Sequence, residues 1–305
     1  MNMLTEVLTG GVRGGTSILY ASLGETVSER AGVVNLGTEG SMLAGALAGY
    51  AVAAETGQPW LGVAAGAVAG GLLAAVHAYL VIGRGANQLA TGLVVLFLGL
   101  GLTSLFGVSY VQAIAPSFRP VEIPGFHAIP LLGDVLFGQD ALVYLSYVLV
   151  PVSWWVIFRS RWGVLLRAAG ERSEVLVTHG HRVAPIQYTA VIVGGMLAGL
   201  GGAHLSLAYA KAWFENMAVG RGFVAVAVVM FAARHPVKVA GGAYLFGAAL
   251  ALSPALQARG YAINQFALDA VPYVVTLVVL IVLGRRRASD VPEGLNKVFE
   301  TTPGR

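Results

Sequence analysis

Long apolar runs dominate the pattern of hydrophobic and polar positions along the chain. A helix needs about 20 mostly apolar residues to cross the hydrocarbon of a bilayer, and such runs recur from near the N-terminus to residue 284. We therefore predict an all-α fold, that of a polytopic integral membrane protein with about nine transmembrane helices, within a range of eight to ten. The predicted spans are residues 9–26, 36–54, 60–82, 88–110, 139–158, 186–209, 220–236, 238–257 and 266–284.

Three of these spans depart from a simple membrane helix. The first is diluted by Arg13 and several glycines, the seventh is short, and the second follows a polar, glycine-rich stretch at residues 29–40. Irregular backbone is tolerated at membrane depth where it is enclosed by protein or lines a cavity, so these three could be broken or re-entrant elements. No internal repeat is clear at the level of residues.

The composition excludes a soluble domain. The chain has 305 residues, of which 56% are hydrophobic and 11% charged, with mean hydropathy +0.74, whereas soluble domains carry about 25% charged residues. The 41 glycines fit helices that approach closely in a membrane. The chain has no cysteine, no phosphate-binding loop, no zinc motif and no Ser/His/Asp arrangement. We therefore expect neither an enzyme nor a bound metal, and no nucleic-acid partner.

Lysine and arginine are unevenly distributed among the predicted loops. They concentrate in residues 159–185, 234–238 and 285–287, while residues 111–138 carry Arg119 beside Glu122 and Asp134. Because cytoplasmic loops are enriched in these residues, we place the basic loops and the C-terminus inside, and the N-terminus outside. The predicted organisation is one multi-pass transmembrane domain at residues 1–287 in the cell (inner) membrane. A polar cytoplasmic tail, expected to be disordered, follows at 288–305.

Polar residues within or beside apolar runs are the candidates for a transport pathway, because such residues are costly in lipid and usually face a cavity or one another. Glu39 has two open interpretations: a structural carboxylate bonded to N–H groups around residues 37–40, or a pathway-lining group. The alternative for Asn87 is helix capping, and a Glu215–Arg221 clamp competes with simple rim charges. The candidate pathway residues are Asn35, Glu39, Asn87, Gln88, Thr91, Glu215, Asn216 and Arg221.

The glycines of the stretch 29–40 suggest a structural role for it. Gly32, Gly37 and Gly40 would permit a tight re-entry of the chain into the membrane, and Asn35 and Glu39 would fix the start of the second span.

The basic loop 159–185 is too long and regular to be only a connection. Its apolar stripe and second apolar run predict two short helices separated at Gly170, with Ser173 as N-cap and Gly180 as C-cap of the second. Two interpretations remain: an amphipathic loop bound to lipid headgroups, or a docking element for a cytoplasmic partner.

Several stretches together resemble a known family. Residues 29–40 have the form Glu-Arg-x-Gly-Val-x-Asn-Leu-Gly-x-Glu-Gly, and residues 87–93, 166–171, 194–205 and 220–227 are similar to later blocks of the same family. The chain resembles permease subunits of bacterial ATP-binding-cassette (ABC) importers, in the ribose and branched-chain amino-acid permease superfamily, nucleoside and simple-sugar subgroup. Departures from the family pattern lie at residues 178–181 and 231–234.

The resemblance implies a mechanism and partners. Two permease chains, expected to be different proteins, would form a membrane core, each resting on a cytoplasmic ABC ATPase, while an extracytoplasmic solute-binding protein delivers substrate near residues 111–138. ATP would be bound by the ATPase, so no cofactor is expected in this chain. The residues implied in ATPase coupling are Arg167, Gly170, Glu171, Arg172, Glu174 and Gly180.

Two other functions are considered beside the importer. A secondary transporter driven by an ion gradient would need an intramembrane carboxylate relay, for which only Glu39 and Asp269 are candidates. A membrane scaffold without transport activity is the third possibility.

Overall fold

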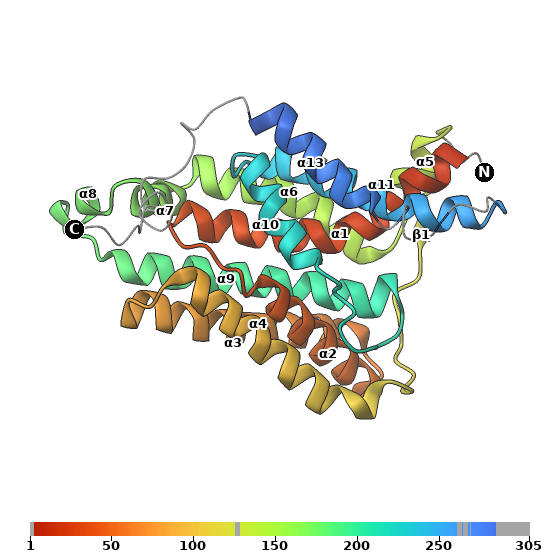
Figure 1. The fold of residues 1–305 in the computed structure, drawn as a ribbon, viewed down its shortest axis with the longest axis horizontal. Helices are drawn as coiled ribbons and strands as arrows, with labels where there is room; N and C mark the ends of the chain where they lie inside the picture. Colours follow the sequence, from red (N-terminus) through yellow and green to blue (C-terminus); the bar gives the residue numbers. More distant parts are fainter. Residues whose placement is uncertain (1–2, 126–128, 261–263, 265–267, 269, 285–305) are drawn as a thin grey trace.

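The computed structural model describes residues 3–125, 129–260, 264, 268 and 270–284. Nearly all of these residues are helical, and the only strands among them, β1 (Val121–Glu122) and β2 (Gly138–Gln139), form one short antiparallel pair (Figure 1). The helices are α1 (Met3–Arg30), α2 (Thr38–Thr56), α3 (Pro59–Ala78), α4 (Gln88–Gly107), α5 (Leu132–Leu136), α6 (Ala141–Arg159), α7 (Arg161–Glu171), α8 (Ser173–Thr178), α9 (Val183–His204), α10 (Arg221–Phe231), α11 (Pro236–Gln257) and α13 (Val271–Gly284).

Three of the long helices continue into a short turn of different pitch. The π-helices η1 (Tyr79–Gly83) and η3 (Leu205–Tyr209) extend α3 and α9, and the 3₁₀-helix η2 (Val108–Tyr110) extends α4. With these extensions, five helices in the described part are long and apolar enough to cross a membrane: 59–83, 88–110, 141–159, 183–209 and 236–257. The predicted all-α membrane fold is confirmed at this level.

The predicted count of nine spans is not confirmed. α1 is long enough but carries Glu6, Arg13, Glu25, Glu29 and Arg30. The seventh predicted span, 220–236, is wrong as drawn, because α10 has only 11 residues and ends at Phe231. The predicted tail at 288–305 lies outside the described residues, as does Asp269.

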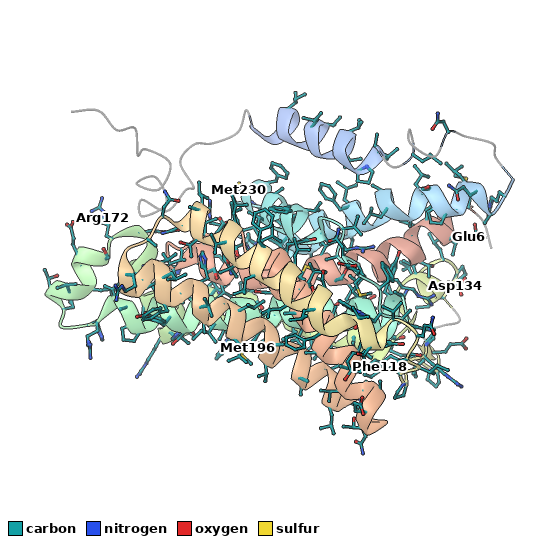
Figure 2. All side chains as sticks on the ribbon, turned by 60° about the horizontal axis from the view of Figure 1, so that its bottom comes forward. Glu6, Phe118, Asp134, Arg172, Met196 and Met230 are labelled. Carbon is teal, nitrogen blue, oxygen red and sulfur yellow. The ribbon has the colours of Figure 1, made fainter. Side chains whose placement is uncertain are left out.

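The long helices run roughly side by side between two ends of the molecule (Figure 1). One end carries α7 and α8, and we call it the α7 end. The other carries the N-terminus, α5 and the β1–β2 pair, and we call it the α5 end. Figure 2 shows Arg172, which directly follows α7, at the opposite end from Glu6 and Asp134.

The chain turns back into the molecule after α1. α1 runs from the α5 end to the α7 end, and residues 31–37, the first connection, return toward the middle, where α2 begins (Figure 1). Gly40, in the first turn of α2, packs on Val95 and Leu96, which lie midway along α4. α2 therefore starts at the depth of the middle of a membrane span.

The same arrangement recurs, inverted, in the second half of the chain. α9 runs from the α7 end to the α5 end, residues 210–220, the second connection, return to the middle, and α10 runs from there toward the α7 end (Figure 1). Gly222 of α10 packs directly on the backbone of Glu39 in α2, so the N-termini of the two short helices meet.

Contacts of the flanking helices repeat as well. Gly11 and Gly15 of α1 pack on Gly247 of α11, and in the same way Gly199 of α9 packs on Gly66 and Gly70 of α3. Glycines four residues apart let two backbones approach closely in a membrane.

Two buried hydroxyl groups occupy corresponding positions in the two halves. Ser22 of α1 donates to the carbonyl of Ala225 in α10 over 3.2 Å, and Ser206 donates to the carbonyl of Ala46 in α2 over 2.9 Å. Residues 10–22 and 194–206 are therefore structural equivalents. They share Gly10 with Gly194, Gly11 with Gly195, Gly15 with Gly199 and Ser22 with Ser206, but the other positions differ, and glycine is too frequent in this chain for so short a match to reveal a repeat.

Candidate functional site

The meeting point of α2 and α10 is organised by Glu39. Its carboxylate accepts hydrogen bonds from the backbone N–H groups of Gly220, at 2.7 Å, and Gly222, at 2.5 Å, and the side chain is buried. A carboxylate is stabilised at the positive end of a helix. The expected bonds to N–H groups of residues 37–40 are therefore wrong: Glu39 caps α10, a helix 181 residues further along the chain.

The turn before α2 is held by two side chains. Asn35 accepts a hydrogen bond from the N–H of Gly37 at 2.9 Å, and its own N–H donates to Glu25 at 2.8 Å. The hydroxyl of Thr38 donates to the other oxygen of Glu25 at 3.1 Å. Asn35 and Glu25 are both buried. Asn35 thus lies where it shapes the turn rather than on an open surface.

The backbone of the first connection finds its hydrogen-bond partners in side chains from three other helices. The N–H of Val34 donates to Gln88 of α4 at 2.8 Å, and its carbonyl lies 3.1 Å from the imidazole of His77 in α3. Gln187 of α9 donates to the carbonyl of Ala31 at 3.0 Å. Buried backbone groups need such partners, and Gln88 therefore supports the chain across a helix interface.

The remaining candidates on α4 have local roles. Asn87 is exposed and caps α4, accepting from the N–H groups of Leu89 and Ala90 at 3.0 Å each. This is the capping alternative considered for Asn87. Thr91 is buried in the first turn of the same helix.

The second connection differs in exposure. Lys211, Phe214, Glu215, Asn216 and Val219 are all exposed. The segment lies at membrane depth, because its Trp213 packs on Gly107 at the end of α4 and Gly220 meets Glu39 at the middle. The structure thus leaves irregular, polar chain uncovered along the half of the span nearer the α5 end.

Glu215 and Arg221 do not form a clamp. Glu215 accepts a hydrogen bond from the hydroxyl of Ser104 in α4. Arg221 donates to the carbonyl of Met217 at 3.2 Å, and its guanidinium lies 5.3 Å from the centre of the Tyr209 ring.

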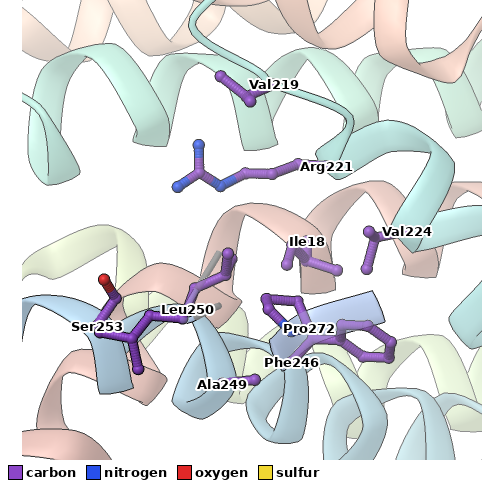
Figure 3. A pocket seen from close by; sticks show the side chains of 10 residues that line it. Ile18, Val219, Arg221, Val224, Phe246, Ala249, Leu250, Ser253 and Pro272 are labelled. Carbon is purple, nitrogen blue, oxygen red and sulfur yellow. The ribbon is translucent and has the colours of Figure 1, made fainter. Parts of the chain in front are cut away.

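Arg221 borders a partly open cavity. The cavity has a volume of about 340 Å³ and lies between α1, α10, α11 and α13 (Figure 3). Its walls are mostly apolar: Ile18, Val219, Arg221, Val224, Phe246, Ala249, Leu250, Ser253, Leu268 and Pro272. The candidate pathway residues are thus divided among the buried junction, the start of α4, the exposed second connection and a partly open cavity.

The predicted pair of short helices in the loop 159–185 is present as α7 and α8. The helix break lies at Arg172 rather than at Gly170. The N-cap of α8 is Arg172, which makes no side-chain capping hydrogen bond, so the prediction of Ser173 as N-cap is wrong: Ser173 is the first residue of the helix. Gly180 follows α8 with φ of 78°, a left-handed conformation that suits glycine. Glu171, Arg172 and Glu174 are exposed.

Two of the coupling candidates face inward instead. Arg167 lies with its guanidinium 5.5 Å from the centre of the Phe158 ring. Gly170 is buried, and a Cβ added there would lie 2.4 Å from the carbonyl oxygen of Arg30. These two residues connect α7 with the rest of the chain.

A buried ion pair at the α7 end was not predicted from the sequence. Arg234, in the turn between α10 and α11, lies 2.6 Å from the carboxylate of Glu29, and both side chains are buried. The predicted first span ended at residue 26, so Glu29 was assigned to a loop. The available signal was that Glu25 and Glu29 share one face of a helix, being four residues apart.

The neighbouring His235 lies in the same turn, outside the spans. Burial, together with the charges of Lys238 and Arg30, lowers the pKa of the His235 imidazole below its usual value. The ring is therefore neutral at neutral pH.

Arg13 also has a defined role at the opposite end. It donates to the side chain of Gln139 at 2.9 Å and to the carbonyl of Gly138 at 3.1 Å. The charge that diluted the first predicted span therefore ties β2 to α1.

Comparison with known proteins agrees with this architecture. The family model described as branched-chain amino acid transport system / permease component matches residues 7–283. The chain is 44% identical over 273 residues to a putative glucose ABC transporter permease protein of Haloferax volcanii, covering 88% of this chain and 82% of that protein.

Two further relatives are named for nucleosides. A guanosine ABC transporter permease protein of Bacillus subtilis is 32% identical over 251 residues, covering 77% of this chain and 78% of the relative. A nucleoside ABC transporter permease protein of Lactococcus lactis is 27% identical over 315 residues, covering 98% of each. The chain therefore belongs to the family of branched-chain amino acid transport system permease components, and it is a membrane-spanning transport subunit of an ABC transporter rather than an enzyme.

Proposed function

We propose that this permease subunit translocates a nucleoside or a simple sugar along the face that carries the second connection. The observation that carries the proposal is the exposure of five side chains of the second connection at membrane depth in the single chain, those of Lys211, Phe214, Glu215, Asn216 and Val219. Irregular backbone is not tolerated against lipid, only against protein or in a water-filled cavity. This face therefore meets a second permease subunit, an aqueous pathway, or both.

The proposed topology has nine crossings, two of them broken. The unbroken ones are α1, α3, α4, α6, α9, α11 and α13, and the broken ones are the first connection with α2 and the second connection with α10. The positive-inside rule supports placing the α7 end in the cytoplasm, because Arg161, Arg172 and Arg182 lie there. The N-terminus is then outside and the chain leaves α13 on the inside.

ABC permeases act with an ATPase and a solute-binding protein. For this chain we propose that the exposed residues Glu171, Arg172 and Glu174 face the ATPase, and that residues 111–138 at the α5 end receive the solute-binding protein. The second permease subunit is proposed to be a different chain, as the resemblance to nucleoside-type systems implies.

The substrate class is supported by the chemistry of the exposed segment and by the relatives. Lys211 offers hydrogen-bond donors, Glu215 offers acceptors and Asn216 offers both. The two opposite charges balance, which suits a neutral polar solute. The relatives are named for glucose, guanosine and nucleosides, which are all neutral polar solutes.

An ion-gradient mechanism has less support. A proton relay needs a carboxylate that can change its partners, whereas both oxygens of Glu39 already accept N–H groups of α10. The other candidate, Asp269, lies outside the described residues.

The test is uptake by the assembled transporter in proteoliposomes, with the solute-binding protein added outside. Labelled guanosine and labelled glucose are supplied in parallel, with a ligand screen by thermal shift on the binding protein to rank further solutes. We expect uptake of one of them that requires ATP and is unaffected by a protonophore. Uptake that survives without ATP and stops when the proton gradient is collapsed would contradict the proposal, as would uptake of neither solute class.

A further inference from the structure

The inner surface of α7 touches the last turn of α1. Gly170 is so close to that turn that an added Cβ would lie 2.4 Å from Arg30 O and 2.9 Å from Gly32 N. Such contact leaves no room for α7 to move toward α1 without displacing residues 30–32. A shift of α7 is therefore passed directly to the end of α1 and the start of the first connection.

The Phe158 ring lies beside the charged groups that surround this contact. Phe158, at the end of α6, lies 5.3 Å from the guanidinium of Arg30 and 5.5 Å from that of Arg167 in α7. Its ring also lies 5.3 Å from that of His235, in the turn before α11. Cations within about 6 Å of a ring are attracted to its face, so Phe158 joins α7, α1 and the α10–α11 turn.

Residues at the end of α1 hold the α10–α11 turn in place. Arg30 donates to the carbonyls of Ala233 and Arg234, at 3.2 Å each, and Glu29 pairs with the side chain of Arg234 at 2.6 Å. Ala233 and Arg234 have φ of 50° and 57°, a left-handed conformation that residues with a Cβ rarely adopt. The turn keeps this conformation because α1 bonds to it on two sides.

α10 is therefore fastened at both of its ends. The turn at its C-terminal end is bonded to Arg30 and Glu29 of α1, and the backbone N–H groups at its N-terminal end are bonded to Glu39 of α2. With only 11 residues, α10 is a short rigid rod. Displacement of the α10–α11 turn must reach Gly220 and the exposed second connection.

We propose that Phe158 and Arg30 are positioning residues that transmit the movement of the ATPase-docked α7 to α10 and the second connection. This rests on the proposed function, in which α7 and α8 form the ATPase dock. The route runs through contacting groups only: α7, the Phe158 ring, Arg30, the α10–α11 turn, α10 and residues 210–220.

The absence of cysteine from the sequence makes a direct test possible. In the complete complex with its ATPase, Asn216→Cys places the one thiol of this chain on the exposed second connection, and labelling is read on this subunit alone after the subunits are separated on a denaturing gel. The rate of its labelling by a membrane-impermeant maleimide is measured without nucleotide and with ATP plus vanadate. We expect the rate to change by about fivefold or more, the range of ordinary coupling between sites. The change should disappear in Phe158→Leu and Arg30→Gln.

Two variants control for simple damage. Phe158→Tyr keeps the ring and should keep the nucleotide-dependent change. Trp155→Leu removes an exposed aromatic ring from the same helix and should also keep it. The rate of ATP hydrolysis by each complex reports whether the ATPase is still docked, and we expect it to persist in Phe158→Leu.

Three results would overturn the proposal: no nucleotide-dependent change in the parent complex, an undiminished change in Phe158→Leu, or an equal loss in Trp155→Leu. The labelling needs no transported solute. If it behaves as expected while neither guanosine nor glucose is taken up, the substrate assignment fails and the transmission route stands.

Discussion

The two connections occupy equivalent places in the inverted halves but differ in burial and in their hydrogen-bond partners. The first, residues 31–37, is buried apart from the half-buried Leu36, and its backbone bonds to His77, Gln88 and Gln187. The second, residues 210–220, leaves its charged and polar side chains exposed. The polar groups of the first connection therefore find their partners within the chain, whereas those of the second are left open to a partner outside it.

Backbone conformation follows the same division. In the first connection only Gly32 has a positive φ, 83°, which costs glycine nothing. In the second, Lys211, Asn216 and Val219 have φ of 54°, 55° and 46°, and for a β-branched residue such as valine this conformation is a genuine outlier. Strained backbone of this kind collects at functional sites. The first connection is scaffold, and the second is the surface along which we propose that the solute passes.

The junction between the two connections should be the most sensitive point. Glu39→Ala leaves the N–H groups of Gly220 and Gly222 without their acceptor, and we expect it to lower the free energy of unfolding by roughly 3 kcal/mol. Denaturant unfolding of the purified protein in detergent measures this loss. Glu39→Gln retains one acceptor oxygen and should lose about half as much; equal stability of all three proteins would show that the junction does not hold α10.

Close packing around the first connection predicts the next largest effect. An added Cβ at Gly92 would lie 2.8 Å from both Cβ and N of Leu36, so Gly92→Ala should cost about 2 kcal/mol through overpacking. Gly101, on the same helix, has no atom within 4 Å of an added Cβ. Gly101→Ala should therefore raise stability by up to about 1 kcal/mol through helix propensity. The same unfolding assay compares them. A similar free energy of unfolding for both variants would mean that residues 31–37 can shift to make room for the added methyl group.

The smallest effect on stability is expected in the second connection, where the effect on transport is large. Glu215→Gln should change the free energy of unfolding by no more than about 0.5 kcal/mol, as exposed substitutions do, while uptake by the assembled transporter falls. Gln88→Leu, which removes the acceptor of the Val34 N–H, should instead cost about 1–2 kcal/mol. Uptake and unfolding are measured for both variants; normal uptake by Glu215→Gln would remove this residue from the pathway.

Much of this protein could be predicted because hydrophobic pattern is a local property. The length of an apolar run decides whether a helix can cross a bilayer, and this placed the five apolar spans within a few residues. Local turn chemistry likewise predicted the re-entry after Gly32 and the two short helices of 159–185, and it offered the capping of α4 as one of two interpretations of Asn87. The first span was predicted to end at residue 26, whereas α1 continues to Arg30 and includes Glu29.

Tertiary structure alone decided which polar group meets which. Glu39 was recognised as a candidate, but its partners lie 181 and 183 residues away on α10, and nothing in the spacing of either segment specifies the other. The same holds for Glu29 with Arg234, and for Gln88 and Gln187 on the backbone of residues 31–37. Local sequence determined which segments enter the membrane and where they break. The packing of the two inverted halves decided how the broken ends are joined, because buried polar groups bond to whatever neighbours the fold brings to them.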